Sequence, residues 1–274
     1  MTSESPAPID TVAHPTNRMH RYAGYAFDLD GTVYLGDELL PGAAETIAEL
    51  RAGGAKVVFA TNNPLRRAED YAAKLRALGI EARSADVITS LDVLAAYLGR
   101  HHSGAALLLV SEPLVKDVLV GHGFTVVTEP ERADVVVVSF DRTFDYAKLH
   151  AAFRAVRAGA VIVATNPDAF CPTADGGLPD CAAMLAAVEA STGQRVEAVA
   201  GKPSGQMAQA LLDRLGVPAA DAVIVGDRLM TDVAMARRTG MVGVLVLTGA
   251  TTRADLRDAS IVPDAVIDRL TDLL

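Results

Sequence analysis

Short apolar runs rich in β-branched residues alternate with amphipathic stretches along most of this chain, and this alternation constrains the fold more than any other feature. The runs are continuous rather than alternating with polar residues, as expected of strands covered on both faces. Strands that alternate with helices predict parallel sheets joined by right-handed crossovers. The predicted strands are residues 25–27, 56–60, 105–110, 135–138, 161–164, 223–225 and 242–247.

Three of the intervening stretches show where a helix ends as well as which face is apolar. Each is followed by a glycine, which commonly ends a helix because it adopts the left-handed conformation without strain. The chain is therefore predicted to fold as an α/β protein. The predicted helices are 66–78, 204–215 and 231–239, followed by Gly79, Gly216 and Gly240.

The length of 274 residues permits one domain with an insertion or two domains in tandem. A hydrophobic share of 50% argues against a disordered chain. The formal net charge of -9 argues against a non-specific nucleic-acid binder or a protein that binds anionic membranes, since both need a basic surface. The same acidity would repel an anionic substrate unless a metal or local groups reverse the field.

No segment of the sequence has the features of a membrane span or a signal peptide. The longest apolar runs, such as 105–110, are far shorter than the ~20 residues that cross a bilayer. Residues 1–20 contain three prolines and little apolar content, and they are predicted to form a disordered tail. Cys171 and Cys181 are too few for a disulfide scaffold or a structural zinc site, so a cytoplasmic protein is expected.

Two carboxylates directly follow the first predicted strand, in the motif Asp28-Leu29-Asp30-Gly31-Thr32. In open parallel sheets, ligands bind outside the carboxyl ends of the strands, so a site is expected at these acids. Side chains two residues apart in an extended segment point the same way, and Gly31 allows the chain to turn sharply after them. The alternative is an ordinary Asp-Gly turn whose carboxylates are solvated.

Three further polar motifs stand beside predicted strand ends or helix starts. Each has a simpler explanation when taken singly: a polar turn, a surface lysine before a proline, or an N-cap at Thr231 or Asp232. Their shared position would bring acids, a hydroxyl and a lysine to one rim of the sheet. The motifs are Thr61-Asn62-Asn63-Pro64, Gly201-Lys202-Pro203, and Gly226-Asp227-Arg228 with Thr231-Asp232.

Together and in this order, the four motifs resemble the signature of the haloacid dehalogenase-like superfamily. Within it they resemble subfamily IIA, the para-nitrophenyl phosphatase-like branch, over residues 25–249. The resemblance implies a Rossmann-like parallel-sheet core with an inserted smaller α/β cap domain. It also implies a phosphoric monoester hydrolase that works through an aspartyl-phosphate intermediate.

The resemblance assigns a role to each matching residue. Asp28 would be the nucleophile, and Asp30 would protonate the leaving group and then activate water as general acid and base. The transferring phosphoryl group would be held by Thr61, Asn62 and Lys202. These roles are expectations that come with the resemblance.

A magnesium ion is implied by the same resemblance. Its ligands would be the Asp28 carboxylate, the Asp30 main-chain carbonyl and Asp227, with Asp232 acting through water or from a greater distance. Magnesium and Lys202 would turn an acidic site into an anion acceptor. The net charge of -9 is then compatible with a phosphate ester as substrate.

The long gap between Thr61 and Lys202 matches the place where the resembling branch carries its cap. The predicted domains are a core of residues 21–84 plus 196–274 and a cap of residues 85–195. A cap of this kind excludes water and contacts the leaving group. Its expected substrate-facing residues are Thr165, Asn166 and Asp168, for which a polar turn is the alternative explanation.

The sequence departs from the branch just after this stretch. Leu178-Pro179-Asp180-Cys181-Ala182 stands where the branch usually has a glycine-rich segment. Asp180 is either the N-cap of a helix that continues to about Ser191 or an acid that disfavours substrates with a second anionic group. The sequence alone leaves both explanations open.

The predicted activity is magnesium-dependent hydrolysis of a small phosphorylated metabolite, namely a sugar, polyol or nucleotide monophosphate. Two alternatives use the same fold. One is a phosphotransferase that passes the phosphoryl group to another alcohol, and the other is a metabolite-binding regulator without catalysis. A complete set of acids, hydroxyl and lysine disfavours the regulator. Neither nucleic acid nor membrane is expected as a partner, and a homodimer through the cap is expected from the resemblance.

Overall fold

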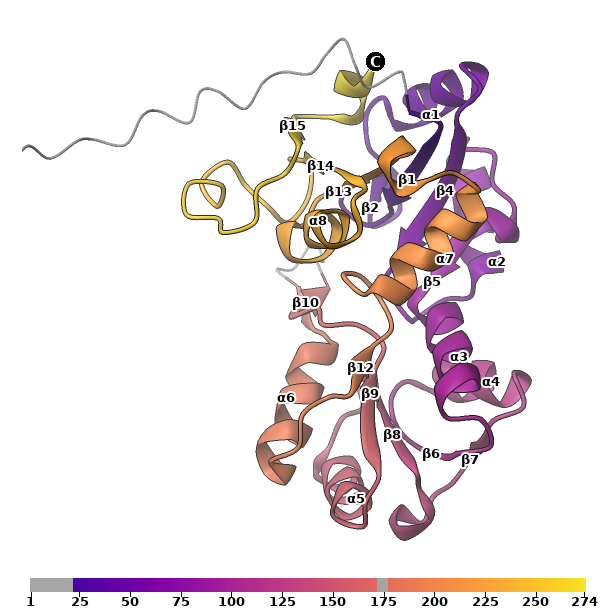
Figure 1. Ribbon diagram of the computed structural model, residues 1–274, viewed down its shortest axis with the longest axis vertical. Coiled ribbons are helices and arrows are strands. Elements are labelled where there is room, and N and C mark those ends of the chain that lie inside the picture. Colours follow the sequence, from indigo (N-terminus) through magenta and orange to yellow (C-terminus); the bar gives the residue numbers. More distant parts are fainter. Residues whose placement is uncertain (1–21, 172–176) are drawn as a thin grey trace, which may run out of the picture. The chain divides into compact units, whose positions relative to one another are not determined.

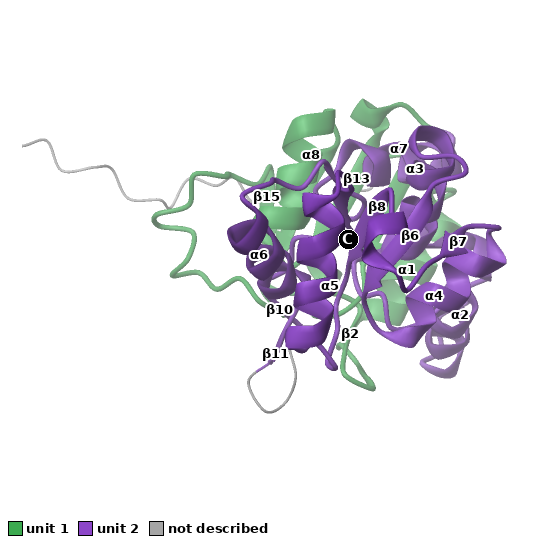
Figure 2. Ribbon diagram, turned by 90° about the horizontal axis from the view of Figure 1, so that it is seen from below, with its two compact units in different colours: residues 1–57, 217–274 green, residues 58–216 purple. Residues whose placement is uncertain are grey.

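The computed structural model describes residues 22–171 and 177–274. The chain divides into two compact units, drawn in different colours in Figure 2. Unit 1 comprises Met1–Val57 and Val217–Leu274, and unit 2 comprises Val58–Gly216. The predicted tail, residues 1–20, lies outside the described residues.

Unit 1 contains a parallel sheet whose strands lie in the order β15, β14, β13, β1 (Figure 1). β1 and β13 are buried along their whole length, as their continuous apolar runs predict. β4 (Lys56–Thr61) begins beside the start of β1, where the Lys56 amide donates a hydrogen bond to the Ala23 carbonyl. The other strands are β1 (Gly24–Asp28), β13 (Ala222–Gly226), β14 (Val242–Val246) and β15 (Ala265–Ile267).

One helix of unit 1 differs from its prediction. The helix predicted over 231–239 begins instead with a π-helical segment, η5 (Leu229–Val233), and continues as α8 (Ala234–Thr239) before Gly240. Leu229 and Val233 pack against Leu245 of β14, which fixes this segment on the sheet. The remaining elements of unit 1 are the antiparallel pair β2 (Tyr34–Leu35) and β3 (Glu38–Leu39), α1 (Ala43–Ala52), η4 (Ala219–Asp221) and η6 (Leu270–Leu273).

Unit 2 contains a second parallel sheet, of five strands in the order β12, β9, β8, β6, β7. Side chains of β6, β8 and β9 form one core cluster with side chains of α5 and α6, so these two helices cover one face of the sheet. The strands are β6 (Ala106–Val110), β7 (Thr125–Val126), β8 (Val135–Val138), β9 (Val161–Ala164) and β12 (Ala198–Val199). The helices are α5 (Tyr146–Arg157) and α6 (Cys181–Thr192).

Two further strands of unit 2, β4 and β5 (Val87–Thr89), pair with each other in parallel. A short antiparallel pair joins β10 (Phe170–Cys171) to β11 (Leu178–Pro179), immediately before α6. The other helices are α2 (Ala68–Ala77), α3 (Ser90–His101), α4 (Pro113–Gly121) and α7 (Gly205–Leu215), with short turns η2 (Ser84–Asp86) and η3 (Pro130–Arg132).

The seven predicted strands are all present, and their bounds agree with the observed ones to within one residue. The helix predicted over 204–215 forms as α7, with the Ser204 hydroxyl as its N-cap and Gly216 in the left-handed conformation after it. Asp180 is the N-cap of α6, which was one of the two explanations offered for it. Among the described residues, no helix combines the length and the apolar character that crossing a bilayer requires.

Candidate active site

Three of the predicted acids form a tight cluster within unit 1. Asp28 ends β1, Asp227 follows β13, and Asp232 lies in the π-helical segment η5. Each offers a carboxylate oxygen within 4.8 Å of the other two, and all three side chains are buried. The strand ends therefore gather these acids as the sequence predicts.

Glycines allow the backbone to approach this cluster closely. A Cβ atom built on Gly31 would lie 2.6 Å from Asp227 Oδ2, and one built on Gly249 would overlap the same carboxylate. Gly31 has a φ of +88°, which glycine adopts without strain. A side chain at either position would therefore displace Asp227.

Backbone and hydroxyl donors orient the three carboxylates. The Ala250 amide donates to Asp227 Oδ2 at 2.6 Å, the Arg228 amide to Asp232 Oδ2 at 3.3 Å, and the Thr32 hydroxyl to Asp28 Oδ2 at 3.4 Å. Three ionised carboxylates at this distance repel one another, and a divalent cation offsets that repulsion. An all-oxygen ligand set suits magnesium or calcium, so the residues fit the predicted metal.

Asp30 lies two residues beyond Asp28 and is partly exposed, unlike the clustered acids. Its backbone pairs with Tyr34 in an isolated bridge, and the Gly31 amide donates to the Tyr34 carbonyl at 2.8 Å. The turn after β1 thus leaves Asp30 near Asp28 in the chain and accessible to solvent. This combination suits a group that must exchange protons with a substrate or with water.

A second cluster of predicted residues lies within unit 2 and is centred on Asn62. Its Oδ1 accepts from the Lys202 amide at 2.8 Å, and its Nδ2 donates to the Lys202 carbonyl at 3.0 Å. The same Nδ2 donates to Asp168 Oδ2 at 2.9 Å. The side-chain amide of Asn62 therefore holds both polar backbone groups of Lys202, which is itself 2% exposed.

The predicted cap residues are bonded to the same cluster. Asn166 Nδ2 donates to the Asn62 carbonyl at 3.1 Å, and the Thr165 carbonyl accepts from the Gly201 amide at 2.7 Å. Gly201 must be small here, because a Cβ atom would overlap Asn62 Oδ1 and lie 2.8 Å from the Thr165 carbonyl. The turn explanation for this stretch is incomplete, since its polar groups connect separate parts of unit 2.

Thr61 lies at the end of β4 and is almost fully buried. Its hydroxyl oxygen accepts from the Asn63 amide at 3.1 Å, and the hydroxyl proton remains available to another acceptor. Neither Thr231 nor Asp232 is an N-cap, because helical structure already begins at Leu229.

Two contributions were absent from the predicted set. The Ser90 hydroxyl donates to the Asn62 carbonyl at 2.8 Å, although no motif includes it. Gly249 and Ala250 surround Asp227 as described above. They follow the predicted strand 242–247, so the rule that sites form at the carboxyl ends of strands was a signal that could have found them.

Comparison with known proteins identifies similar sequences and structures. A family model described as haloacid dehalogenase-like hydrolase matches residues 25–125, and a second, described as HAD-hydrolase-like, matches residues 199–273. The sugar-phosphatase AraL of Bacillus subtilis is 38% identical over 251 residues, which are 92% of this chain and 92% of that protein.

Solved structures of phosphatases are also similar to this chain. The 4-nitrophenylphosphatase from Thermotoga maritima aligns with a TM-score of 0.86 and 37% identity, over 93% of this chain and 97% of that one. A glycerol phosphate phosphatase from Mycobacterium tuberculosis, in complex with magnesium, aligns with a TM-score of 0.84 and 33% identity. That alignment covers 93% of this chain and 77% of the other, and a further structure of that protein holds calcium.

Proposed function

Since the chain belongs to the haloacid dehalogenase-like hydrolases of subfamily IIA and is a phosphatase, we propose that it hydrolyses a small phosphorylated sugar or polyol with the help of magnesium. The observation that carries the metal and the mechanism is the cluster of buried carboxylates on Asp28, Asp227 and Asp232. The names of the sugar phosphatase and of the glycerol phosphate phosphatase support the substrate class.

The metal would be held by Asp28, by the main-chain carbonyl of Asp30 and by Asp227, with Asp232 supporting it through water. A bound magnesium ion neutralises charge on the phosphoryl oxygens and on the carboxylates around it. The close packing of Gly31 and Gly249 against Asp227 supports this assignment, because it fixes one ligand oxygen in place.

The chain's own side chains would carry the two chemical steps. The Asp28 carboxylate attacks phosphorus, the ester P–O bond breaks, and Asp30 gives its proton to the departing alkoxide oxygen. Water then attacks the phosphorus of the aspartyl phosphate while Asp30 takes its proton. The bond between phosphorus and the Asp28 oxygen breaks, which releases inorganic phosphate and restores the carboxylate.

The phosphoryl oxygens would be held by the Thr61 hydroxyl and the Lys202 ammonium group. Asn62 would serve this binding by fixing the backbone of Lys202, and Asp168 would fix Asn62 in turn. Thr165 and Asn166 are fully buried, so their effect on the substrate would pass through the same contacts.

The predicted cap, residues 85–195, would cover the substrate and exclude water. The five-stranded sheet of unit 2 supports the proposal of a cap, because most of its strands lie within these residues. The sheet also includes β12 (Ala198–Val199), which lies just beyond the predicted end of the cap. We further propose a homodimer that forms through the cap. Light scattering on the purified protein would test it, and a monomeric mass at micromolar concentration would contradict it.

Phosphate release from a panel of sugar and polyol phosphates, with magnesium and without an added acceptor alcohol, tests the activity. We expect release by the wild type, loss of activity with a chelator, and recovery when magnesium is restored. Asp28→Asn should reduce turnover by at least ~10³-fold and still fold, as circular dichroism would show. Asp117→Asn in α4 is the matched control and should retain full activity.

Two results would contradict the proposal. Full activity in the chelated enzyme would exclude the metal from the mechanism. Full activity in Asp28→Asn would exclude Asp28 as the nucleophile. Turnover only after an alcohol is added, with the phosphoryl group recovered as an ester of that alcohol, would favour the phosphotransferase instead.

A further inference from the structure

In the five-stranded sheet of unit 2, the strands that follow β6 in the sequence lie on both sides of it. The chain passes from β6 to β7 on one side of it and then returns to β8 on the other side, after which β9 and β12 extend that side. In parallel sheets, a reversal of this kind opens a crevice outside the carboxyl ends of the two diverging strands, where ligands bind. Binding groups are therefore expected at the carboxyl ends of β6 and β8.

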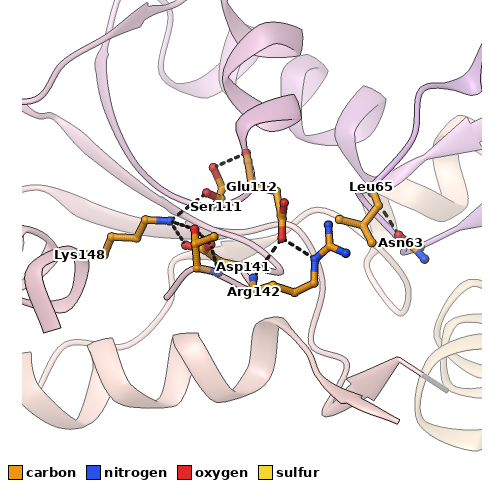
Figure 3. A network of polar contacts seen from close by, with 8 residues as sticks. Asn63, Leu65, Ser111, Glu112, Asp141, Arg142 and Lys148 are labelled. Carbon is orange, nitrogen blue, oxygen red and sulfur yellow. Dashed lines mark hydrogen bonds and ion pairs between the residues drawn. The ribbon is translucent and has the colours of Figure 1, made fainter. Parts of the chain in front are cut away.

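Charged and hydroxyl side chains gather at that position (Figure 3). Ser111 and Glu112 follow β6, while Asp141 and Arg142 follow β8 by three and four residues. Figure 3 shows that Glu112 and Arg142 face each other across the gap between the two segments. Lys148 reaches the same region from the first turn of α5.

These groups form two ion pairs with different exposure. Lys148 Nζ lies 2.5 Å from Asp141 Oδ2, and the Asp141 side chain is fully buried. Arg142 Nε lies 2.7 Å from Glu112 Oε1, with the Arg142 side chain 56% exposed and that of Glu112 12% exposed. The first pair ties the segment after β8 to α5, whereas the second pair is exposed to solvent mainly through Arg142.

The exposed pair retains hydrogen-bonding groups. Glu112 Oε1 accepts both hydrogen bonds from Arg142, one from Nε and one from the backbone amide at 3.1 Å. Among residues 22–171 and 177–274, no hydrogen bond engages the two terminal nitrogens of Arg142 or Oε2 of Glu112. The pair thus presents several N–H donors beside a carboxylate acceptor.

Each residue of the exposed pair also keeps the other charged. The hydrogen bond from Arg142 lowers the pKa of the Glu112 carboxyl, and the hydrogen bond to Glu112 raises the pKa of the Arg142 guanidinium. Both groups therefore stay ionised around neutral pH. Their charges cancel, as do those of Asp141 and Lys148.

We propose that Glu112 and Arg142 bind the hydroxyl groups of the sugar or polyol part of the substrate. A diol offers one hydroxyl to donate to the carboxylate and a neighbouring oxygen to accept from the guanidinium. A charge-balanced pair suits an uncharged polyhydroxylated group, whereas a second phosphate would require an excess of positive charge. This inference rests on the proposed function, because it concerns the same substrate.

The segment after β8, which carries Arg142, is hydrogen-bonded to the proposed phosphate-binding residues within unit 2. Ser139 follows β8 two residues before Asp141, and its hydroxyl oxygen accepts from the Thr165 hydroxyl at 3.0 Å. Thr165 and Asn166 in turn contact Gly201 and Asn62, which hold Lys202. Both ends of a phosphorylated sugar would therefore meet one connected edge of unit 2.

The test compares substrates that share the phosphate and differ in the leaving group. For Arg142→Ala and Glu112→Gln we expect kcat/KM for a sugar or glycerol phosphate to fall about tenfold, mainly through KM. Hydrolysis of 4-nitrophenyl phosphate, whose leaving group has no neighbouring hydroxyls, should change less than about twofold. The matched control is Arg154→Ala, which removes an exposed ion pair with Glu131 near the amino end of β8 and should alter neither substrate.

A binding measurement separates this inference from the proposed mechanism. In an Asp28→Asn background, calorimetry should show about tenfold weaker binding of the sugar or polyol phosphate when Arg142 is also replaced by alanine. Equal affinity would overturn the inference whether or not the wild type hydrolyses the ester. An equal loss for both ester substrates would overturn it as well, because that result would indicate a purely structural role.

Discussion

Asn62 illustrates how one buried side chain can set the position of another. Its amide group bonds both backbone groups of Lys202 and the Asp168 carboxylate, and a buried amide that loses its partner costs about 1–3 kcal/mol. We expect Asn62→Ala to destabilise the protein by about 2 kcal/mol or more and to weaken inhibition by inorganic phosphate. Denaturant unfolding and inhibition constants would measure the two effects.

The adjacent Asn63 provides a matched control for this substitution. Its Oδ1 accepts a local bond from the Leu65 amide at 3.0 Å, its Nδ2 makes only a long contact of 3.9 Å with Cys171 Sγ, and the residue is partly buried. Asn63→Ala should therefore cost less stability and leave phosphate inhibition nearly unchanged. If the two variants behaved alike, Asn62 would have no special role in positioning Lys202.

Gly249 gives a second prediction at the scale of one residue. An alanine there would overlap the Asp227 carboxylate, so we expect Gly249→Ala to reduce magnesium affinity and to lower activity by about tenfold or more. A magnesium titration of activity would show the change. Gly99→Ala in α3 is the control, because that position is open, and it should stabilise the protein by about 0.5–1 kcal/mol.

Site residues whose position follows from the end of their own strand could be predicted from the sequence. Residues that meet only because two distant strands pair could not. Asp28 directly follows the apolar run 25–27 and Asp227 stands one residue beyond the run 223–225, so their strands are enough to place them in one cluster. Glu112 and Arg142 are 30 positions apart and follow strands that are not consecutive. Their contact depends on β8 pairing with β6 although β7 lies between them in the sequence, which no local pattern shows.

Among the elements, strands were predicted better than helices for a physical reason. A strand buried on both faces is a continuous apolar run whose ends are the ends of the run. The start of the helix predicted at Thr231 was wrong because the chain first forms a π-helical segment, in which the Val233 amide donates to the Arg228 carbonyl at 3.4 Å. The 3.6-residue period used for the prediction does not describe such a segment.

The ion pair between the ends of β6 and β8 predicts a dependence of stability on pH. The hydrogen bond from Arg142, opposed by burial and aided by Lys148, lowers the pKa of Glu112 below its ordinary value of 4.5. A lowered carboxyl pKa stabilises the fold above the unfolded-state value and ceases to do so as pH falls through the folded-state value. We expect the stability advantage of the wild type over Glu112→Gln to be constant near neutral pH and to shrink below about pH 4.5.

Urea unfolding of both proteins between pH 3.5 and 7 would provide the measurement. Glu129→Gln is the control, since its ion pair with Arg132 is exposed on both sides and a surface pair contributes little. An advantage of wild type over Glu112→Gln that grew as the pH fell would contradict the assignment of a lowered pKa to Glu112.

At the scale of the whole molecule, the sequence predicted an α/β fold, and the parallel sheets of the structure confirm it. Unit 1 joins two separate segments, as a core interrupted by an insertion must. The division falls within β4 and after α7. It depends on which residues lie close together in the folded chain, which composition does not show. The predicted bounds of core and cap remain a prediction.

The net charge of -9 yields a final prediction about the folded molecule. Three of its acids are buried together in unit 1, and a ligand that binds only the folded state stabilises it by about 2.7 kcal/mol at a concentration of 100 times Kd. For a chain of this size we expect saturating magnesium to raise Tm by roughly 5–10 °C. Differential scanning fluorimetry with and without the ion would measure the shift without reference to activity.

The position of the acids, rather than their number, should determine this effect. Asp227→Asn removes one buried carboxylate and should abolish most of the magnesium-dependent shift. Asp268→Asn removes an exposed carboxylate paired with Arg253 and should retain the full shift, although both variants change the net charge equally. An equal shift in the two variants would mean that magnesium acts through the overall charge of the surface, and the carboxylates of unit 1 would then not be the metal site.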